Sequence, residues 1–182
     1  MKQPFLHIEG VSVHFPVKKG LLQRQVAQVK AVENVTLSLK RGEAFGLVGE
    51  SGCGKTTLAR TVLRLVDTTE GAIWFDGQNI TNLTGTALAP YRKRVAAVFQ
   101  DPFSSLNPRM TAGAIIAEVL HVRKYAGDIK ARVIELLGIC GLSDRFVDLY
   151  PHQMSGGQRQ RVGIARALSV EPDLIVCDEA VS

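Results

Sequence analysis

A glycine-rich stretch at residues 49–57 constrains the fold of this chain more than any other part of the sequence. It reads Gly49-Glu50-Ser51-Gly52-Cys53-Gly54-Lys55-Thr56-Thr57, which fits the template of a glycine, four residues and then Gly-Lys-Ser/Thr. The apolar run at 44–48 before it predicts a buried parallel strand, and apolar residues at helical spacing over 55–66 predict a helix after it. A strand, this loop and a helix in that order predict a phosphate-binding loop in an α/β fold.

The residue types in this stretch match the chemistry of holding a phosphate chain. Gly49, Gly52 and Gly54 allow the backbone to bend so that successive N–H groups point inward, and the following helix adds its positive end. Lys55 supplies a positive charge for the outer phosphates, and Thr56 supplies a hydroxyl for Mg²⁺. A plain glycine-rich turn is the alternative, and the loop alone does not distinguish a kinase, a GTPase and a transport ATPase.

Composition and charge narrow the class of protein. The chain has 182 residues, of which 46% are hydrophobic and 21% charged, as in an ordinary globular domain, and no apolar run approaches the roughly 18 residues that span a bilayer. The net charge of +5 comes from scattered basic residues, which favours a solvated surface with a site for a polyanionic nucleotide. The three cysteines and four histidines are dispersed, so they suggest neither a disulfide framework nor a zinc site.

Hydrophobic patterns on both sides of the loop predict the remaining elements. Strands are expected at 5–15, 35–39, 72–75, 95–99 and 174–177, with an exposed basic loop at 16–28, and helices are expected after Thr111 and Asp128 and around Phe146. We therefore predict an α/β fold: a P-loop NTPase core with an N-terminal antiparallel β subdomain and an inserted α-helical subdomain. The core is assigned to residues 1–100 and 158–182, and the helical subdomain to 101–157.

Two carboxylates, Asp178 and Glu179, end the strand predicted at 174–177, whose unbroken apolar run predicts that it is buried. Ligands of open α/β sheets bind at this carboxyl edge. In phosphoryl transfer an aspartate at such a place holds Mg²⁺ through water, and a following carboxylate can polarise the attacking water. The alternative is a strand end with two solvated acids.

The sequence Ser155-Gly156-Gly157-Gln158 opens a further helix, and two roles are open for it. It can present backbone donors and a hydroxyl to an anion at the positive helix end. It can also be a helix cap, with Ser155 as N-cap and Gln158 completing a capping box. One ATP has no need of two anion-binding helix ends from a single chain, so the first role predicts a head-to-tail dimer in which this end meets the partner's γ-phosphate.

Four motifs together resemble the nucleotide-binding domain of ABC transporters. Gly49–Thr56, Gln100, Ser155–Gln158 and Cys177-Asp178-Glu179 are similar to the Walker A, Q-loop, signature and Walker B motifs and occur in the same order. Finer features resemble the ATPases of oligopeptide, dipeptide and nickel importers. They are Phe99-Gln100-Asp101-Pro102, the stretch 105–111, Tyr150-Pro151-His152, the stretch 178–182 and the basic segment at 16–28.

The resemblance implies a role for each matching residue. Thr56 and Gln100 would ligate Mg²⁺, Asp178 would support it through water, and Glu179 would be the catalytic general base. Phe15 would stack on adenine, with an ordinary apolar strand residue as the alternative. The residues implied to bind ATP are Gly49, Glu50, Ser51, Gly52, Cys53, Gly54, Lys55, Thr56, Thr57, Gln100, Phe15, Ser155, Gly156, Gly157 and Gln158.

The resemblance also implies a function and partners. The expected protein is an ATPase subunit of an ABC importer for peptides or nickel, which uses ATP and Mg²⁺ and lies peripherally at the cytoplasmic face of the inner membrane. Its expected partners are a second cassette, the transmembrane permease subunits and, indirectly, a solute-binding protein. A soluble ABC ATPase acting on nucleic acid or ribosomes is the alternative. The short helices and the lack of heptads or an arginine-rich arm at 101–157 disfavour it, so no nucleic-acid partner is expected.

Two further motifs of the family, the D-loop and the switch histidine, are expected after the Walker B strand. Ser182 matches the first residue of the D-loop, and none of the histidines follows the Walker B strand, so none can be the switch histidine of the family. Residues 1–182 alone are therefore expected to bind nucleotide weakly or not at all and to hydrolyse it poorly. The sequence does not identify the cargo, nor whether the cassette pair is a homodimer, a heterodimer or fused.

Overall fold

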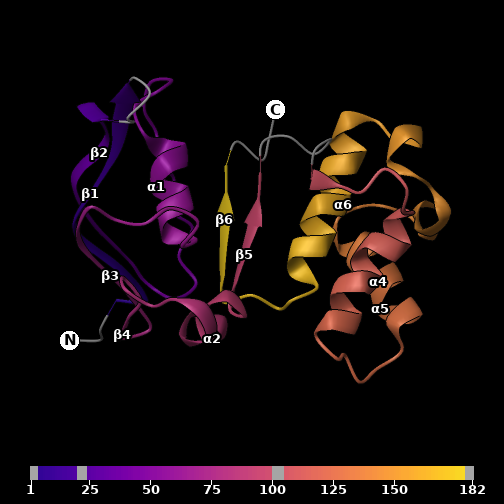
Figure 1. Cartoon of the computed structure of the whole chain (residues 1–182). Helices are drawn as coiled ribbons and strands as arrows, with labels where there is room; N and C mark the ends of the chain where they lie inside the picture. Colours follow the sequence, from indigo (N-terminus) through magenta and orange to yellow (C-terminus); the bar gives the residue numbers. More distant parts are fainter. Residues whose placement is uncertain (1–3, 20–23, 100–104, 179–182) are drawn as a thin grey trace. The chain divides into compact units, whose positions relative to one another are not determined.

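The structure, a computed structural model, describes residues 4–19, 24–99 and 105–178 and forms two compact units, 1–91 and 92–182 (Figure 1). The short elements η1 (Gly85–Leu88) and α2 (Ala89–Arg92) lead from the first unit into the second. The predicted division into a core of 1–100 and 158–182 and a helical subdomain of 101–157 stays a prediction.

The first unit is built on an antiparallel sheet with the strand order β2-β1-β3-β4. The strands are β1 (Leu6–Lys19), β2 (Arg24–Leu39), β3 (Glu70–Phe75) and β4 (Gln78–Asn79). Ile8 and Val11 are three residues apart and would face opposite sides of a regular strand, yet both are fully buried. A register shift between them, with Gly10 at a φ of +57°, turns Val11 back to the core face.

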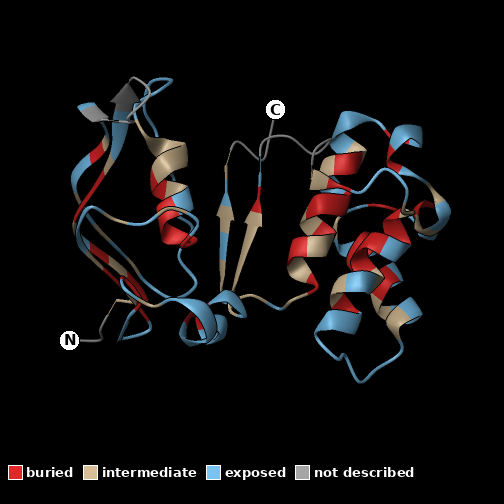
Figure 2. Ribbon diagram, viewed as in Figure 1, coloured by how far each residue is buried: buried red, intermediate tan, exposed pale blue. Residues whose placement is uncertain are grey.

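The prediction of a polar loop at 16–28 is wrong. Strand β1 continues to Lys19 and β2 begins at Arg24, with Pro16 paired to Gln28 and Val17 to Ala27. The cross-strand ladder extends beyond the buried sheet because valine favours strands, and a hairpin exposed on both faces accepts polar residues. Residues 15–17 and 26–30 of the hairpin are exposed, and Figure 2 draws the described part of this end of the hairpin in pale blue.

Helix α1 (Lys55–Val62) follows the glycine-rich loop and buries Leu58, Thr61 and Val62. It confirms the predicted helix but ends earlier than residue 66, because Arg64 takes a left-handed φ of +55°. The predicted strand at 44–48 is wrong: the segment is irregular, and Val48 is 93% exposed. A parallel strand needs hydrogen-bonded neighbours, and none of the described strands pairs with this run.

The second unit contains a parallel pair of strands, β5 (Val95–Val98) and β6 (Leu174–Cys177), with Val98 opposite Cys177. Both strands were predicted from their apolar runs, and their parallel pairing agrees with a parallel core. The expectation that 174–177 is buried is wrong, because its residues alternate between half-buried and exposed, and Ile175 is 38% exposed.

A helical cluster forms the core of the second unit. Its elements are α4 (Ala112–Val122), α5 (Ile129–Ile139), η2 (Asp144–Asp148), η3 (Pro151–Gln153) and α6 (Gly156–Leu168). The predicted caps are confirmed: the Thr111 side chain accepts from Ala114 N at 3.2 Å, and Asp128 accepts from Ala131 N at 3.1 Å. The buried core residues are Leu106, Ala112, Ile115, Ile116, Leu120, Val133, Leu136, Leu137, Leu142, Phe146, Met154, Val162 and Ala165 (Figure 2).

Ile116→Ala is expected to lower the free energy of unfolding by about 2–5 kcal/mol, because Ile116 is fully buried in this cluster and its truncation leaves a cavity. Urea unfolding followed by circular dichroism measures the change. Val122→Ala on the same helix is the control, since Val122 is 77% exposed and its loss should be nearly neutral. Equal effects of the two substitutions would contradict the assignment of Ile116 to the core.

None of the helices within the described ranges is both long and apolar enough to cross a membrane.

Candidate nucleotide-binding site

The glycine-rich loop leaves the start of α1 open. Gly52 and Gly54 have positive φ values of 80° and 96°, and Gly54 is the N-cap of α1 without a side-chain cap. The first turn of the helix carries no acidic residue. The first turn of α1 and the positive end of the helix dipole therefore suit an anion.

Lys55 folds back over this loop. Its Nζ donates to Gly49 O and to Glu50 O, each at 2.7 Å. These are neutral carbonyl acceptors, and a phosphate oxygen is a stronger acceptor for an ammonium group. The Lys55 side chain is thus placed at the loop with bonds that an incoming phosphate can replace.

A close backbone contact fixes the loop against strand β2. A Cβ atom at Gly54 would lie 2.2 Å from Ala31 O, so only glycine fits at this place. Ala31 follows Val29 by two residues, or roughly 7 Å of strand, and Val29 is paired with Phe15 of β1. Phe15 is 42% exposed. Through its pairing with Val29, it lies about two strand positions from the point where the loop contacts β2.

Gly54→Ala is expected to weaken nucleotide binding strongly and to destabilise the fold, with roughly 1–3 kcal/mol coming from the left-handed backbone alone. The clash with the Ala31 carbonyl adds to this loss because that carbonyl belongs to a sheet strand. Nucleotide titration and thermal unfolding measure the two effects. Gly138→Ala in α5 is the matched control, since a Cβ there meets nothing within 4 Å and should leave both unchanged or slightly raise stability.

Asp178 lies at the carboxyl edge of the parallel strand pair in the second unit. Its backbone N donates to Val98 O at 2.9 Å, which sets Asp178 beside the chain as it leaves β5. Its side chain is half-buried. Gln100 and Glu179, which follow β5 and Asp178 in the sequence, lie outside the described residues.

The described part of the chain contains no group of three or more His, Cys, Asp or Glu residues that could hold a metal ion. Mg²⁺ in nucleotide sites is typically held by one or two protein groups together with substrate phosphates and water, so such a group is not required. The donor set predicted from the sequence, a hydroxyl, an amide oxygen and a carboxylate, consists of the hard oxygen ligands that Mg²⁺ prefers.

The segment Ser155–Gln158 forms the N-terminus of α6 and is a capping box. Ser155 Oγ accepts from Gln158 N at 3.3 Å, and Ser155 N donates to Gln158 Oε1 at 2.8 Å. Ser155, Gly156 and Gly157 are exposed. The capping role is therefore present, and because Oγ acts as an acceptor, its own O–H is left to donate to an anion.

Two arginines of α6 bond to backbone carbonyls of preceding segments and were not singled out from the sequence. Arg159 is buried and donates to Pro151 O at 3.1 Å. Arg166 donates to Ser105 O at 2.5 Å and lines a small hollow with Ala97, Val98, Phe99, Ser105, Gln160 and Gly163. The sequence held no signal for either, since arginine on a helix is usually exposed.

Residues 32–182 match the ABC transporter family. The chain is 50% identical over 184 residues to the oligopeptide transport ATP-binding protein AppF of Bacillus subtilis (strain 168), covering all of this chain and 56% of that protein. It is 47% identical over 182 residues to the glutathione import ATP-binding protein GsiA of Pectobacterium atrosepticum, covering 99% of this chain and 29% of that protein. The chain thus spans about half, or less, of the length of these curated relatives.

Among solved structures, the fold is similar to a dimeric post-hydrolysis state of the ATP-binding cassette MJ0796 bound to ADP and Pi. The TM-score is 0.83 with 32% sequence identity, and the match covers 97% of this chain and 74% of that one. A second dimeric structure of the same cassette gives a TM-score of 0.81 with 30% identity.

Proposed function

Because this chain belongs to the ABC transporter family, we propose that it is the ATP-binding and ATP-hydrolysing part of an importer, and that peptides are the transported class. The observation that carries the proposal is the open start of α1, where Lys55 folds over a loop with glycines at positive φ. This local geometry suits the phosphate chain of a nucleotide.

The loop residues 49–57 hold the phosphates in this proposal. Lys55 exchanges its two carbonyl acceptors for β- and γ-phosphate oxygens, and the N–H groups at the start of α1 donate to the same chain. Phe15 stacks on the adenine, which is supported by its exposure and by the β2 register that relates it to the loop.

Thr56, Gln100 and Asp178 would hold Mg²⁺, Asp178 through water. When bound, the ion supplies positive charge against the phosphate oxygens. Glu179 accepts a proton from the attacking water while the water oxygen bonds to the γ-phosphorus and the bond to the ADP oxygen breaks. The products are ADP, inorganic phosphate and the proton held by Glu179.

Ser155, Gly156, Gly157 and Gln158 act on the ATP of a second cassette. The exposed start of α6 offers backbone N–H groups and the Ser155 hydroxyl proton to an anion. Two chains arranged head to tail would each complete the other's site. The similar cassette MJ0796 was solved as a dimer, which supports this arrangement.

The relatives' names support the choice of peptides, since one is an oligopeptide transport protein and the other imports glutathione, itself a small peptide. Permease subunits in the membrane and a solute-binding protein complete the importer, and this chain sits peripherally on the cytoplasmic face of the inner membrane.

Uptake of a labelled oligopeptide, measured in cells that lack the gene, tests this proposal. We expect the complete wild-type gene to restore uptake and the Lys55→Ala gene to fail at the same protein level. Labelled glutathione and nickel, measured in parallel, separate the three cargo classes. Peptide uptake that does not change on loss of the gene would contradict the proposed cargo.

A further inference from the structure

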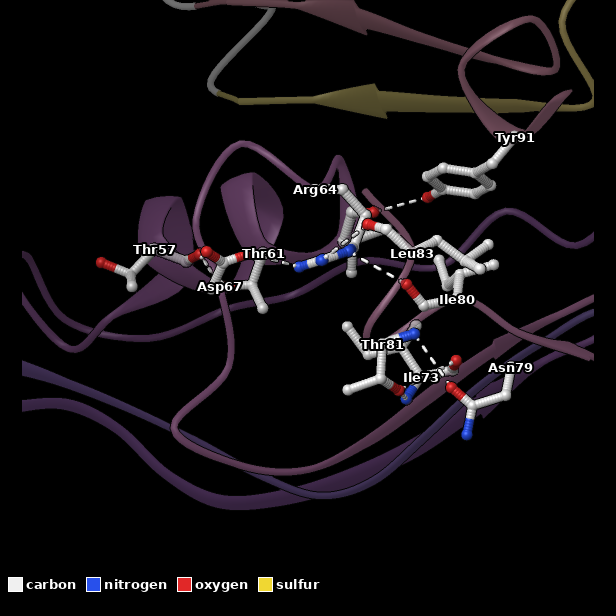
Figure 3. A network of polar contacts seen from close by, with 11 residues as sticks. Thr57, Thr61, Arg64, Asp67, Ile73, Asn79, Ile80, Thr81, Leu83 and Tyr91 are labelled. Atoms are coloured by element: carbon white, nitrogen blue, oxygen red, sulfur yellow. Dashed lines mark hydrogen bonds and ion pairs between the residues drawn. The ribbon is translucent and has the colours of Figure 1, made fainter. Parts of the chain in front are cut away.

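The far end of helix α1 is held by a buried arginine that has no part in the site described above (Figure 3). Arg64 is the second residue after the helix, and its side chain is only 3% exposed. Its backbone lies at φ +55°, a conformation in which glycine is expected after a helix. A large charged side chain that is buried at a position favouring glycine indicates that its contacts compensate for the strained backbone.

The Arg64 guanidinium joins α1 to the segment that follows strand β4. Its Nε donates to Ile80 O at 3.1 Å and its NH2 to Leu83 O at 3.3 Å, while NH1 bonds Asp67 Oδ1 at 2.9 Å. Arginine's planar fork serves several acceptors at fixed angles, which a lysine cannot do. The three bonds therefore fix both the position and the orientation of the C-terminal end of α1.

The segment at 79–83 is in turn pinned to the sheet, so the bonds from Arg64 end on a rigid support. Ile80 N donates to Ile73 O at 2.8 Å, and the Thr81 hydroxyl accepts from Ile73 N at 2.8 Å. Figure 3 shows these groups in one network with Tyr91, whose hydroxyl donates to Val62 O at 2.5 Å. Burial raises the pKa of Tyr91, so its phenol stays a proton donor.

Helix α1 has only two turns and needs tertiary contacts to hold its place. At its N-terminus, Gly54 lies against the Ala31 carbonyl of β2. At its C-terminus, the Arg64 and Tyr91 bonds attach it to the segments that follow β4. The N-terminus carries Lys55 and Thr56, so a shift at the far end moves these residues together.

We propose that Arg64 is a positioning residue for nucleotide binding, which holds the C-terminal end of α1 so that Lys55 and Thr56 stay aligned with the phosphate chain. This inference rests on the proposed nucleotide-binding function.

The test is a titration of the complete protein with the fluorescent analogue mant-ATP and Mg²⁺, alongside thermal unfolding. In Arg64→Gly the guanidinium and its three bonds are lost, while the left-handed backbone becomes unstrained, which offsets part of the lost stability. We expect mant-ATP to bind about tenfold more weakly to Arg64→Gly. Arg64→Lys, which keeps the charge but not the fork, should fall between Arg64→Gly and wild type.

Two controls separate positioning from loss of stability. Asp67→Asn removes the charge of the 89% exposed carboxylate that Arg64 bonds and should leave affinity within about twofold of wild type. Ile116→Val lowers stability in the other unit and should leave affinity unchanged.

Wild-type affinity in Arg64→Gly would overturn the inference while leaving the proposed function intact, and so would an equal loss in Ile116→Val. If Arg64→Gly fails to fold, Arg64→Lys decides by the same comparison. A wild-type protein that does not bind mant-ATP would overturn the proposed function and, with it, this inference.

Discussion

Glu179→Gln is expected to lower the rate of ATP hydrolysis by roughly a hundredfold or more while ATP remains bound. The glutamine keeps the size of the side chain but cannot accept the proton of the attacking water. Phosphate release under multiple turnover measures the rate, and retention of radiolabelled ATP on a filter measures binding. In this variant, phosphate release should fall while retention of ATP stays at the wild-type level.

A matched control for this prediction is Glu9→Gln, which makes the same chemical change at an exposed position of β1. Its turnover should equal that of the wild type. Hydrolysis by Glu179→Gln at the wild-type rate would show that another group takes the proton, and Glu179 would lose its proposed role.

Lys55→Ala is expected to weaken ATP binding by roughly ten- to a hundredfold, because a charge-assisted bond to the phosphates is lost. The two loop carbonyls that now accept from Lys55 Nζ remain, and without the ammonium they add negative potential where the phosphates bind. Equilibrium titration with mant-ATP measures the affinity, and thermal unfolding shows whether the fold is retained.

Lys130→Ala removes the same charge from an exposed position of α5 and controls for the change in net charge. It should bind ATP like the wild type. Equal losses in Lys55→Ala and Lys130→Ala would mean that the nucleotide is attracted by the overall charge of the chain and not by the loop.

Much of the fold could be predicted because the signals were local. The strand at 35–39 and the helix starts at Thr111 and Asp128 each depend on neighbouring residues, and the structure contains them. The predicted α/β fold class, a P-loop NTPase, is confirmed by the structural likeness to known ABC cassettes.

The errors concern features that depend on distant residues. The apolar run 44–48 has the composition of a parallel strand, but composition supplies no pairing partner. The hairpin at 16–28 was hidden because an extension with two solvated faces needs no hydrophobic alternation.

In the candidate site, too, the local motifs could be predicted and the long-range contacts could not. The loop glycines and the Ser155 capping box were visible from spacing alone. The supports were not: Arg64 contacts carbonyls 16 and 19 residues away, and Arg166 contacts one 61 residues away. Every residue has a backbone carbonyl, so the pattern of side chains in the sequence does not predict which carbonyl an arginine will contact.

The molecular mass of the complete Glu179→Gln protein, measured by light scattering with Mg²⁺ and saturating ATP, is the most direct test of the proposed ATP-dependent dimer. In the proposed mechanism, two cassettes close on ATP through Lys55 of one and Ser155 of the other. We expect a doubled mass with ATP, the single mass with ADP, and the single mass again when Ser155→Arg is added. A single mass with ATP demonstrably bound would contradict this mechanism.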